Sequence, residues 1–399
     1  MKRILFVNGN FNDIPLIESA HKLGMYVITS GNDPDGEGHA FSDEYVACDY
    51  SDKEAMLKVA KKLNIDAICS CGNDFGATTA AYVAEELGLP GHDRYDVSRV
   101  FHEKDEFKKV VNRYGLPSPK SKSFINEDEA ISYLESVDFP QIIKPVDLGG
   151  GKGISVANSI DEGIKSIQFA FKKSKVKHIV IEDYIKGTQH GFICFIKNEK
   201  VVFDYSTNDY SYLNPYMVWI GSGYPADGYL DVREKIIHDV ELLAKELKMA
   251  DGFLTIQYMM KDGQAYYLET MRRCLGNLHF KCISEDVNFN LYDLFVAAEA
   301  GEDTSKYLKD YTLTGKYSGF LGLYADHNGV FDGVIFDDQF EKCIIDKMFL
   351  CSNGHVIENY LEDKLGMVWF SFTSEEQRDY FMSNRNNLFR ITYMKQEGD

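Results

Sequence analysis

The chain has 399 residues, enough for two or three domains, and its 44% hydrophobic and 26% charged residues are typical of soluble globular proteins. Its 62 acidic and 43 basic residues give a formal net charge of −19, which repels nucleic acid and anionic lipid over most of the surface. The apolar run at the start is too short for a signal peptide, and no run reaches the roughly 18 residues needed to span a bilayer. We therefore expect a cytoplasmic protein with no nucleic-acid partner and no membrane association. An anionic small molecule stays possible as a ligand, because a few basic residues can focus a local positive field in a cleft.

The eight cysteines form no CxxC pair and no regular framework. This pattern favours buried, reduced thiols over disulfides. Cys69 and Cys71 lie two residues apart on an expected strand and would face the same side, which by itself is weak grounds for a metal site. We expect no metal there.

Strand and helix patterns alternate at the start of the chain. Residues 3–8 are nearly all apolar, as in a buried parallel strand, and Gly9 opens the turn into a helix over 14–23. The alternation continues with a strand, a helix and a strand over 26–29, 54–63 and 67–70. Such alternation predicts an open parallel sheet covered by helices.

A helical pattern over 97–114 ends at Gly115, and the prolines that follow prevent its continuation. The region beyond mixes helices with long strands joined by short turns, including an Asp-Gly hairpin turn at 262–263. The tail is rich in strands and has a short terminal helix. The fold class is therefore α/β and α+β: an open parallel α/β domain, a central domain of two α+β subdomains and a small strand-rich domain, over 1–93, 94–305 and 306–399.

The sharpest local feature is a glycine-rich loop between two expected strands. It runs Lys-Pro-Val-Asp-Leu-Gly-Gly-Gly-Lys-Gly from Lys144 to Gly153. Glycine lets the backbone approach a bulky anion, and the loop amides can surround phosphate oxygens while Lys144 and Lys152 supply positive charge. The order strand, loop, strand differs from Walker and dinucleotide loops, which open a helix. We interpret the loop as a phosphate clamp, with a flexible glycine hairpin as the alternative.

Four stretches in a fixed order around this loop resemble the ATP-grasp superfamily. Lys104 leads a helix that exits through Gly-Leu-Pro-Ser-Pro, and Lys144 ends the strand Ile-Ile-Lys-Pro. Residues 181–187, Ile-Glu-Asp-Tyr-Ile-Lys-Gly, look like the family's hinge strand, and residues 268–273, Leu-Glu-Thr-Met-Arg-Arg, resemble its E-x-N-x-R end strand. The resemblance covers roughly residues 95–300, and the ordered set is far more specific than any single piece.

The resemblance implies a role for each matching residue. Lys104 and Lys144 would hold the nucleotide phosphates, Glu269 and Gln257 would bind magnesium, and Arg273 would stabilise charge on the transferred phosphoryl group. The loop residues expected to hold phosphate are Gly149, Gly150, Gly151, Lys152 and Gly153. The residues expected to contact adenine and ribose are Glu182, Asp183, Tyr184, Ile185 and Gln189.

Two positions depart from the family pattern. Gln257 stands where a glutamate metal ligand is usual, and Met271 stands at the asparagine of E-x-N-x-R. An amide oxygen binds magnesium more weakly than a carboxylate does, and a thioether is a poor ligand for a hard cation. One-metal and two-metal binding both stay open, as does a degenerate protein that binds nucleotide without turning it over.

The N-terminal α/β pattern and the strand-rich tail agree with one branch of the superfamily, which resembles biotin carboxylase, the carbamoyl-phosphate synthase large subunit and the ATP-using ligases of purine biosynthesis. Membership implies an ATP- and Mg²⁺-dependent ligase. It would activate a carboxylate as an acyl phosphate, join it to an amine or related nucleophile, and release ADP and phosphate. The alternatives are a small-molecule kinase, a nucleotide-binding regulatory protein and, more distantly, a dinucleotide-dependent oxidoreductase. The acid, the nucleophile and the choice between monomer and homodimer stay open.

Further residues could contact the substrates. Loops 8–10 and 72–74 follow the carboxyl ends of expected parallel strands, where such sheets place ligands. The aromatic stretch 208–227 could wall a pocket or pack on the strand-rich part. Arg272 could bind a substrate carboxylate or merely an acid on the surface of the protein. We expect His190 and His279 to be structural, because acyl-phosphate chemistry asks little of a protein base.

Overall fold

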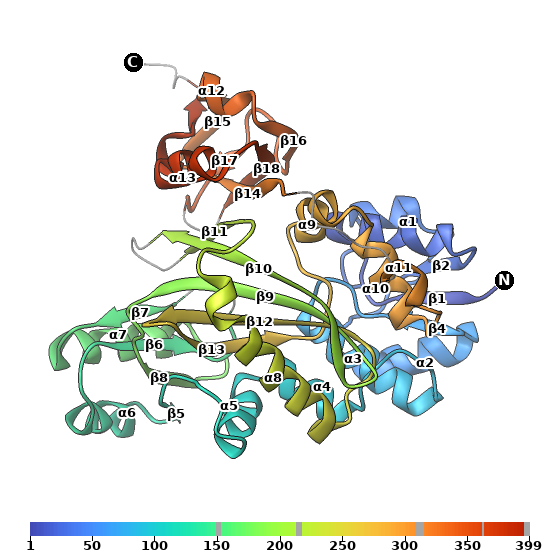
Figure 1. The fold of residues 1–399 in the computed structure, drawn as a ribbon, viewed down its shortest axis with the longest axis horizontal. Helices are drawn as coiled ribbons and strands as arrows, with labels where there is room; N and C mark the ends of the chain where they lie inside the picture. Colours follow the sequence, from blue (N-terminus) through green and yellow to red (C-terminus); the bar gives the residue numbers. More distant parts are fainter. Residues whose placement is uncertain (149–152, 213–217, 309–314, 361–362, 395–399) are drawn as a thin grey trace. The chain divides into compact units, whose positions relative to one another are not determined.

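The computed structural model describes residues 1–148, 153–212, 218–308, 315–360 and 363–394 (Figure 1). The chain divides into two compact units, each assembled from several segments. Unit 1 comprises Met1–Ser118, His190–Ser206 and Gly228–Thr312, and unit 2 comprises Pro119–Gln189, Thr207–Asp227 and Leu313–Asp399. The expected domains 1–93, 94–305 and 306–399 divide the chain along the sequence, and their boundaries stay a prediction.

The N-terminal part of unit 1 is an open parallel sheet with strand order β3-β2-β1-β4, which confirms the α/β architecture expected there. Its central strand is covered on both faces, since the consecutive residues Ile4, Leu5 and Phe6 are fully buried. The strands are β1 (Arg3–Phe6), β2 (Tyr26–Thr29), β3 (Glu44–Tyr45) and β4 (Ala67–Cys69). The helices are η1 (Phe11–Asp13), α1 (Ile14–Lys22), η2 (Glu37–Phe41), α2 (Lys53–Leu63) and α3 (Asp74–Leu87).

The helical pattern over 97–114 resolves into two helices, α4 (Tyr95–His102) and α5 (Lys104–Arg113). Glu103 between them has an extended backbone with φ −111° and ψ 114°, so the expectation of one continuous helix was wrong. The break places Lys104 at the first position of α5, where the chain has just changed direction.

The rest of unit 1 is a sheet with strand order β13-β12-β9-β10, packed against α4, α5 and α8. Its two hairpins close with left-handed residues, Asn198 and Glu199 in one and Asp262 and Gly263 in the other, and the second is the Asp-Gly turn that the sequence predicted. The strands are β9 (Thr188–Lys197), β10 (Lys200–Tyr212), which ends in unit 2, β12 (Gly252–Lys261) and β13 (Gln264–Met271). The helices are α8 (Tyr229–Leu247), α9 (His279–Val287), α10 (Leu291–Glu299) and α11 (Ser305–Leu308).

Unit 2 begins with an antiparallel sheet of strand order β5-β8-β6-β7. One face buries Ile143, Ile179 and Ile181 against α6 and α7, which flank the sheet (Figure 1). The strands are β5 (Ser121–Phe124), β6 (Gln141–Pro145), β7 (Ser155–Ala157) and β8 (Ile179–Asp183). The helices are α6 (Glu127–Tyr133), η3 (Leu134–Ser136) and α7 (Ile160–Lys173).

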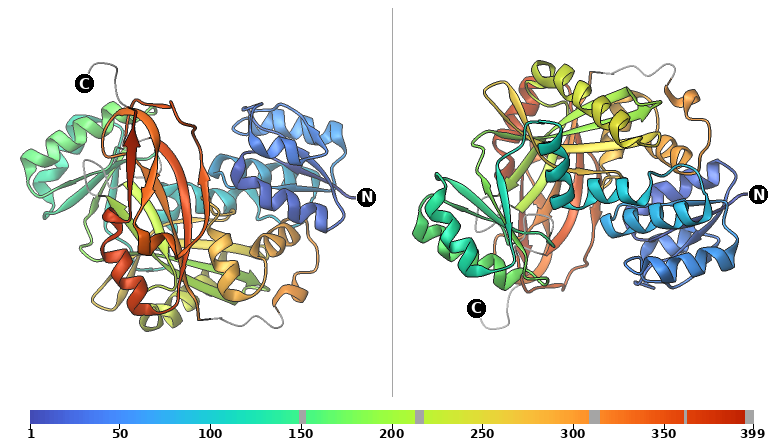
Figure 2. Two further views of the ribbon diagram at one scale, coloured as in Figure 1. Left: turned by 90° about the horizontal axis from the view of Figure 1, so that it is seen from above. Right: turned by 90° about the horizontal axis from the view of Figure 1, so that it is seen from below.

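The remaining part of unit 2 is rich in strands, as the sequence predicted. The end of β10 continues into the order β11-β14-β18-β16, and a further sheet has the order β17-β15-β19. Helix α13 packs against β14 and β18 (Figure 2). The strands are β11 (Val218–Gly223), β14 (Tyr317–Tyr324), β15 (Gly329–Phe336), β16 (Ile344–Phe349), β17 (Val356–Ile357), β18 (Lys364–Phe372) and β19 (Phe389–Tyr393). The helices are α12 (Asp338–Glu341), α13 (Glu375–Ser383) and η4 (Arg385–Asn387).

None of the helices within the described ranges is long and apolar enough to cross a lipid bilayer.

Candidate active site

In unit 1 the structure brings Lys104, Gln257 and Glu269 together. Gln257 in β12 and Glu269 in β13 are direct partners in the antiparallel register. Directly opposite residues point to the same face with their Cβ atoms about 5 Å apart, so the two side chains are neighbours. The Nζ atom of Lys104, at the start of α5, lies 3.4 Å from Glu269 Oε2. Two oxygen-bearing side chains and a cation therefore share one patch of unit 1.

A β-bulge follows Gln257, between it and Tyr258. Bulges are common next to functional sites because they re-aim a side chain without ending the sheet. Beyond the bulge, Tyr258 is fully buried in the core behind the sheet, while Gln257 stays partly exposed. Met271 lies two residues past Glu269 and faces the same side, with only 9% of its surface exposed.

Arg273 lies just beyond β13 and is bound by Asp74. Its Nε donates to Asp74 Oδ1 at 2.6 Å, its Nη2 to Asp74 Oδ2 at 3.1 Å, and its Nη1 to the Cys274 carbonyl at 3.1 Å. Burial opposes ionisation of Asp74, but Arg273 and His102 together hold the pKa of that carboxyl far below its usual range. Burial also opposes the charge on the guanidinium, yet Asp74 and, more weakly, Glu269 raise the pKa of Arg273.

Arg272 has a structural role instead. Its guanidinium forms an ion pair with Asp93, with Nε to Oδ2 at 2.8 Å, and donates to the carbonyls of Phe253 and Ala250 at 2.8 Å each. Both side chains of the ion pair are buried. The sequence left open a substrate carboxylate or a surface acid, whereas the acid that Arg272 binds is Asp93, which is buried and not at the surface.

His190 and His279 are both buried, at 1% and 9% exposure. His190 stacks on Tyr258 with the ring centroids 5.2 Å apart. These contacts agree with the structural role expected for the two histidines.

In unit 2, Lys144 and Glu182 form a buried ion pair. Lys144 Nζ lies 2.5 Å from Glu182 Oε2, and the two side chains are 12% and 3% exposed. In the register Ile142 faces Glu182, so Lys144 is the diagonal neighbour of Glu182 on the same face. The other face carries Ile143 and packs on the helices. The expected phosphate lysine and the expected adenine-binding glutamate therefore share the face away from the unit 2 core.

The hinge after β8 already uses some of its polar groups. The Asp183 carboxylate accepts from Gln141 Nε2 at 2.9 Å, and the Asp183 amide donates to the Lys120 carbonyl at 2.9 Å. The Tyr184 amide donates to the Pro140 carbonyl at 3.1 Å. The Ile185 amide has no such partner among the described residues. Among the amides of Asp183, Tyr184 and Ile185, the Ile185 amide is therefore the one that, within the described residues, can still donate a hydrogen bond to a ligand.

The glycine loop is described only at its two ends, and Gly149, Gly150, Gly151 and Lys152 lie outside the described residues. At the first end, Asp147 accepts from Ser174 Oγ and the Lys175 amide, each at 2.8 Å. Partial burial disfavours the ionised carboxylate, but these hydrogen bonds outweigh it and hold the pKa of Asp147 below its ordinary value. At the other end, Gly153 has a φ of +75° and runs against the ring of Pro145. Both ends are therefore fixed by specific contacts.

The remaining expected residue, Gln189, lies partly exposed in β9, next to the end of its unit 2 segment. The aromatic stretch 208–227 is described except for residues 213–217. Within it, Asn208 and Asp227 bind each other, with Asn208 Nδ2 to Asp227 Oδ2 at 2.9 Å. The structure thus distributes the expected site residues between the two units, with each set described within its own unit.

Two functional candidates were not singled out from the sequence, namely His102 and Asp147. His102 holds Asp74, and Asp147 holds the start of the glycine loop. Asp147 lies inside the quoted loop motif, but its partner Ser174 is 27 residues away. Nothing in the pattern around His102 points to Asp74, so only the fold could reveal that pair.

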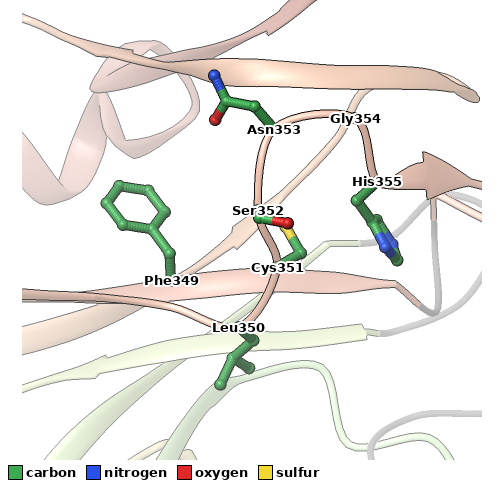
Figure 3. Close-up of a pocket in the computed structure, with 7 residues that line it drawn as sticks. All are labelled: Phe349, Leu350, Cys351, Ser352, Asn353, Gly354 and His355. Carbon is green, nitrogen blue, oxygen red and sulfur yellow. The ribbon is translucent and has the colours of Figure 1, made fainter.

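A hollow elsewhere in unit 2 contains none of these residues. It is lined by seven consecutive residues, Phe349 to His355, whose side chains point in different directions around a loop (Figure 3). No carboxylate or lysine lines it. The candidate site is therefore identified by convergent polar groups and not by this hollow.

Comparison with known proteins supports the assignment reached from these motifs. Residues 102–214 match the family model for the phosphoribosylglycinamide synthetase ATP-grasp (A) domain. Phosphoribosylamine–glycine ligase of Listeria monocytogenes is 24% identical over 259 residues, which are 62% of this chain and 60% of that protein. The carbamoyl phosphate synthase large chain of Clostridium beijerinckii is 20% identical over 272 residues, 67% of this chain and 25% of that protein. The chain thus spans less than two thirds of the length of these relatives.

Solved structures match over almost the whole chain. L-amino acid ligase from Bacillus licheniformis superimposes with a TM-score of 0.82 at 19% identity, covering 99% of each chain. Phosphoribosylglycinamide synthetase from Anaerococcus prevotii gives a TM-score of 0.77 at 20% identity, covering 98% of this chain and 100% of that one. The fold matches these solved structures, and residues 102–214 match the ATP-grasp (A) domain model of phosphoribosylglycinamide synthetase, in agreement with the order of the motifs.

Proposed function

We propose that the protein is an ATP-dependent ligase that joins a carboxylate to an amine or related nucleophile. The observation that carries this proposal is the unit 1 patch, where Gln257 and Glu269 are cross-strand partners and Lys104 lies beside Glu269. Acyl-phosphate chemistry brings a carboxylate to a triphosphate, so the site must supply cations and metal ligands together. The sequence relatives named phosphoribosylamine–glycine ligase suggest the reaction class, and we extend only that class to this chain.

The residues present fit a magnesium-bound nucleotide. Glu269 and Gln257 offer hard oxygen ligands, which magnesium prefers. Within the part of the chain that the structure describes, no three His, Cys, Asp or Glu side chains gather to hold a metal by themselves. A magnesium ion at Glu269 would therefore take its other ligands from phosphate oxygens and water, as is usual for this ion. When bound, magnesium would neutralise charge on the phosphates.

The remaining roles follow the residues' positions in each unit. Lys104, Lys144 and the loop 149–153 would hold the phosphates. Glu182 and the Ile185 amide would hold the adenine, while the Asp183 side chain stays on Gln141. Tyr184 would contribute through its carbonyl, because its amide is already bonded to Pro140. Gln189 would lie at the ribose.

The reaction would proceed in two steps, phosphoryl transfer to the carboxylate and then attack by the amine. A carboxylate oxygen of the substrate attacks the γ-phosphorus, the bond to the β-γ bridging oxygen breaks, and ADP leaves. The amine attacks the carbonyl carbon of the acyl phosphate, the carbon–oxygen bond breaks, and phosphate leaves as the amine loses a proton. Arg273 would donate hydrogen bonds to the phosphoryl group during transfer, where its oxygens carry the most charge.

The test is ADP release against pooled carboxylates and amines, with hydroxylamine replacing the amine in a parallel arm. We expect ADP release that depends on a carboxylate, and a hydroxamate when hydroxylamine is present. ADP release without hydroxamate would indicate a kinase. Saturable ATP binding without ADP release would indicate a regulatory protein, the alternative raised by Gln257 and Met271.

Lys144→Gln is the matching variant, because its amide can still donate a hydrogen bond to Glu182. We expect it to lower kcat/KM about 100-fold, the usual cost of one charge-stabilising donor. Lys109→Ala is the control, since Lys109 is 69% exposed and pairs with Glu106 at the surface. Activity of Lys144→Gln within a few-fold of the parent would contradict the assignment of Lys144.

We also propose that the protein acts in the cytoplasm on small molecules. All eight cysteines lie in the described part of the chain, and none of them forms a disulfide there. Reduced cysteines are typical of that compartment.

A further inference from the structure

Arg273 has most of its hydrogen-bonding capacity taken up by the protein. A guanidinium has five N–H groups, one on Nε and two on each terminal nitrogen. Asp74 takes one from Nε and one from Nη2, and the Cys274 carbonyl takes one from Nη1. Two N–H groups, one on each terminal nitrogen, have no partner among the described residues. The ion pair therefore fixes the plane of the guanidinium and leaves one donor on each tip.

Asp74 is held in place by its surroundings in unit 1. It is the first residue of α3, and the preceding Asn73 caps that helix by accepting from the Gly76 amide at 3.1 Å. The Nδ1 atom of His102, at the end of α4, lies 2.9 Å from Asp74 Oδ1. Although the Asp74 carboxylate is half exposed, it is therefore anchored by two helices.

His102 connects this anchor back to the arginine strand. Its Nε2 accepts from the Arg272 amide at 3.3 Å, so the neutral ring carries its proton on Nδ1 and donates it to Asp74. The His102 side chain is only 1% exposed, which holds this arrangement away from competing water. The contacts Asp74 to His102, His102 to the Arg272 amide, and Arg273 to Asp74 form a closed ring.

We propose that Asp74 is a positioning residue for Arg273. It would hold the guanidinium so that the two remaining N–H groups donate to the phosphoryl group during transfer. This inference rests on the proposed function, because it assumes that Arg273 acts on that group. A guanidinium that is already fixed in position stabilises the developing charge without a further loss of side-chain entropy. A substitution that frees the guanidinium should therefore lower the rate of the chemical step.

The test compares Asp74→Asn and Asp74→Glu with the parent in ADP release, and Asp96→Asn is the control. Asp96 is 70% exposed and binds Arg94 at the surface. We expect Asp74→Asn to lower kcat about tenfold or more, with KM for ATP within about twofold and the melting temperature unchanged. Asp74→Glu keeps the charge and should recover part of the loss. Asp96→Asn should match the parent.

A double variant separates positioning from independent action. If Asp74 acts through Arg273, then Asp74→Asn combined with Arg273→Lys should be no slower than Arg273→Lys alone. Multiplying losses would overturn the proposal, as would an Asp74→Asn enzyme that keeps or exceeds the parent rate. A rise confined to KM for the amine would place Asp74 in substrate binding and overturn it as well.

The two proposals fail in different ways. A parent enzyme with no ADP release against the substrate pools would overturn the proposed function, and this inference with it. A parent enzyme that is active and loses rate with Arg273→Lys but not with Asp74→Asn or Asp74→Glu would overturn the inference alone.

Discussion

Among single residues, the cross-strand pair of Gln257 and Glu269 sets the electrostatics of the unit 1 patch. A glutamate in place of Gln257 would add a second negative charge, whereas the amide adds none. Lys104, 3.4 Å from Glu269, reduces the negative potential further. A cation at this patch would therefore bind more weakly than at a pair of carboxylates, and would depend more on oxygens of the nucleotide.

Restoring the carboxylate tests this account. In Gln257→Glu, a second charged ligand should lower the Mg²⁺ concentration for half-maximal ADP release, on the order of tenfold. Gln264→Glu, at the exposed start of β13, adds the same charge away from the patch and should leave the requirement unchanged. An unchanged Mg²⁺ requirement in Gln257→Glu would remove residue 257 from the metal site.

Among the secondary-structure elements, the end of the glycine-rich loop at Gly153 is a turn in close contact with Pro145. Gly153 has a φ of +75°, and a Cβ there would lie 2.8 Å from Pro145 Cγ. Gly263, in the hairpin between β12 and β13, has nearly the same φ of +73° but open space around it. A side chain would strain the backbone to the same degree at both positions. Only at position 153 would its Cβ also collide with a neighbour, the ring of Pro145.

Alanine at these two positions separates strain from contact. Each variant should lose about 1 kcal/mol of unfolding free energy, because a Cβ disfavours the left-handed region. Only Gly153→Ala should also raise KM for ATP, since the contact with Pro145 forces the loop to shift. Urea unfolding and ADP release would measure the two effects. Equal KM values in both variants would show that the loop exit does not shape the nucleotide site.

The helix break at Glu103 shows what local pattern cannot decide. Apolar residues keep a helical spacing from 97 to 114 because α4 and α5 pack into the same core. The spacing therefore predicted one helix, and the extended Glu103 between the two helices was missed. Periodicity reports which face is buried, and it does not report a single non-helical residue between two buried stretches.

In the molecule as a whole, a buried acid couples folding to pH. Asp13 is fully buried in unit 1, where it accepts from the Asn10 amide at 3.0 Å and the Gly72 amide at 3.3 Å. Burial raises the pKa of Asp13 from 3.8 to about 6, more than these hydrogen bonds lower it. The folded protein therefore holds this proton more tightly than the unfolded chain. The stability from Asp13 is complete below about pH 4 and is lost as the pH rises to about 6.

Asp13→Asn removes this titration. The unfolding free energy of the parent, measured relative to Asp13→Asn, should fall by about 3 kcal/mol between pH 4 and pH 7, since two pKa units correspond to that amount. Urea unfolding of both proteins at several pH values would measure it. A constant difference between parent and variant across this range would show that Asp13 does not titrate there.

Much of the fold and several site residues could be predicted from the sequence, because their signals are local. The run of apolar residues in β1 and the left-handed turn at Asp262 and Gly263 each reflect chemistry within a few neighbouring residues. Lys144 and Glu182 were both singled out, although their ion pair depends on the register of β6 and β8. The resemblance of ordered motifs then identified the superfamily, which the comparisons support.

The sequence by itself therefore determined the parallel N-terminal sheet, the strand-rich tail and the residue types of the site. Only the tertiary structure decided which acid each arginine takes, because Arg273 and Asp74 are 199 residues apart and Arg272 and Asp93 are 179 apart. Arg272 and Arg273 have the same chemistry and adjacent positions, so no local pattern distinguishes them. The packing of α3 and α4 in unit 1 does, because His102 in α4 holds Asp74 in α3, Asp74 takes the Arg273 guanidinium, and the Arg272 guanidinium is left to Asp93.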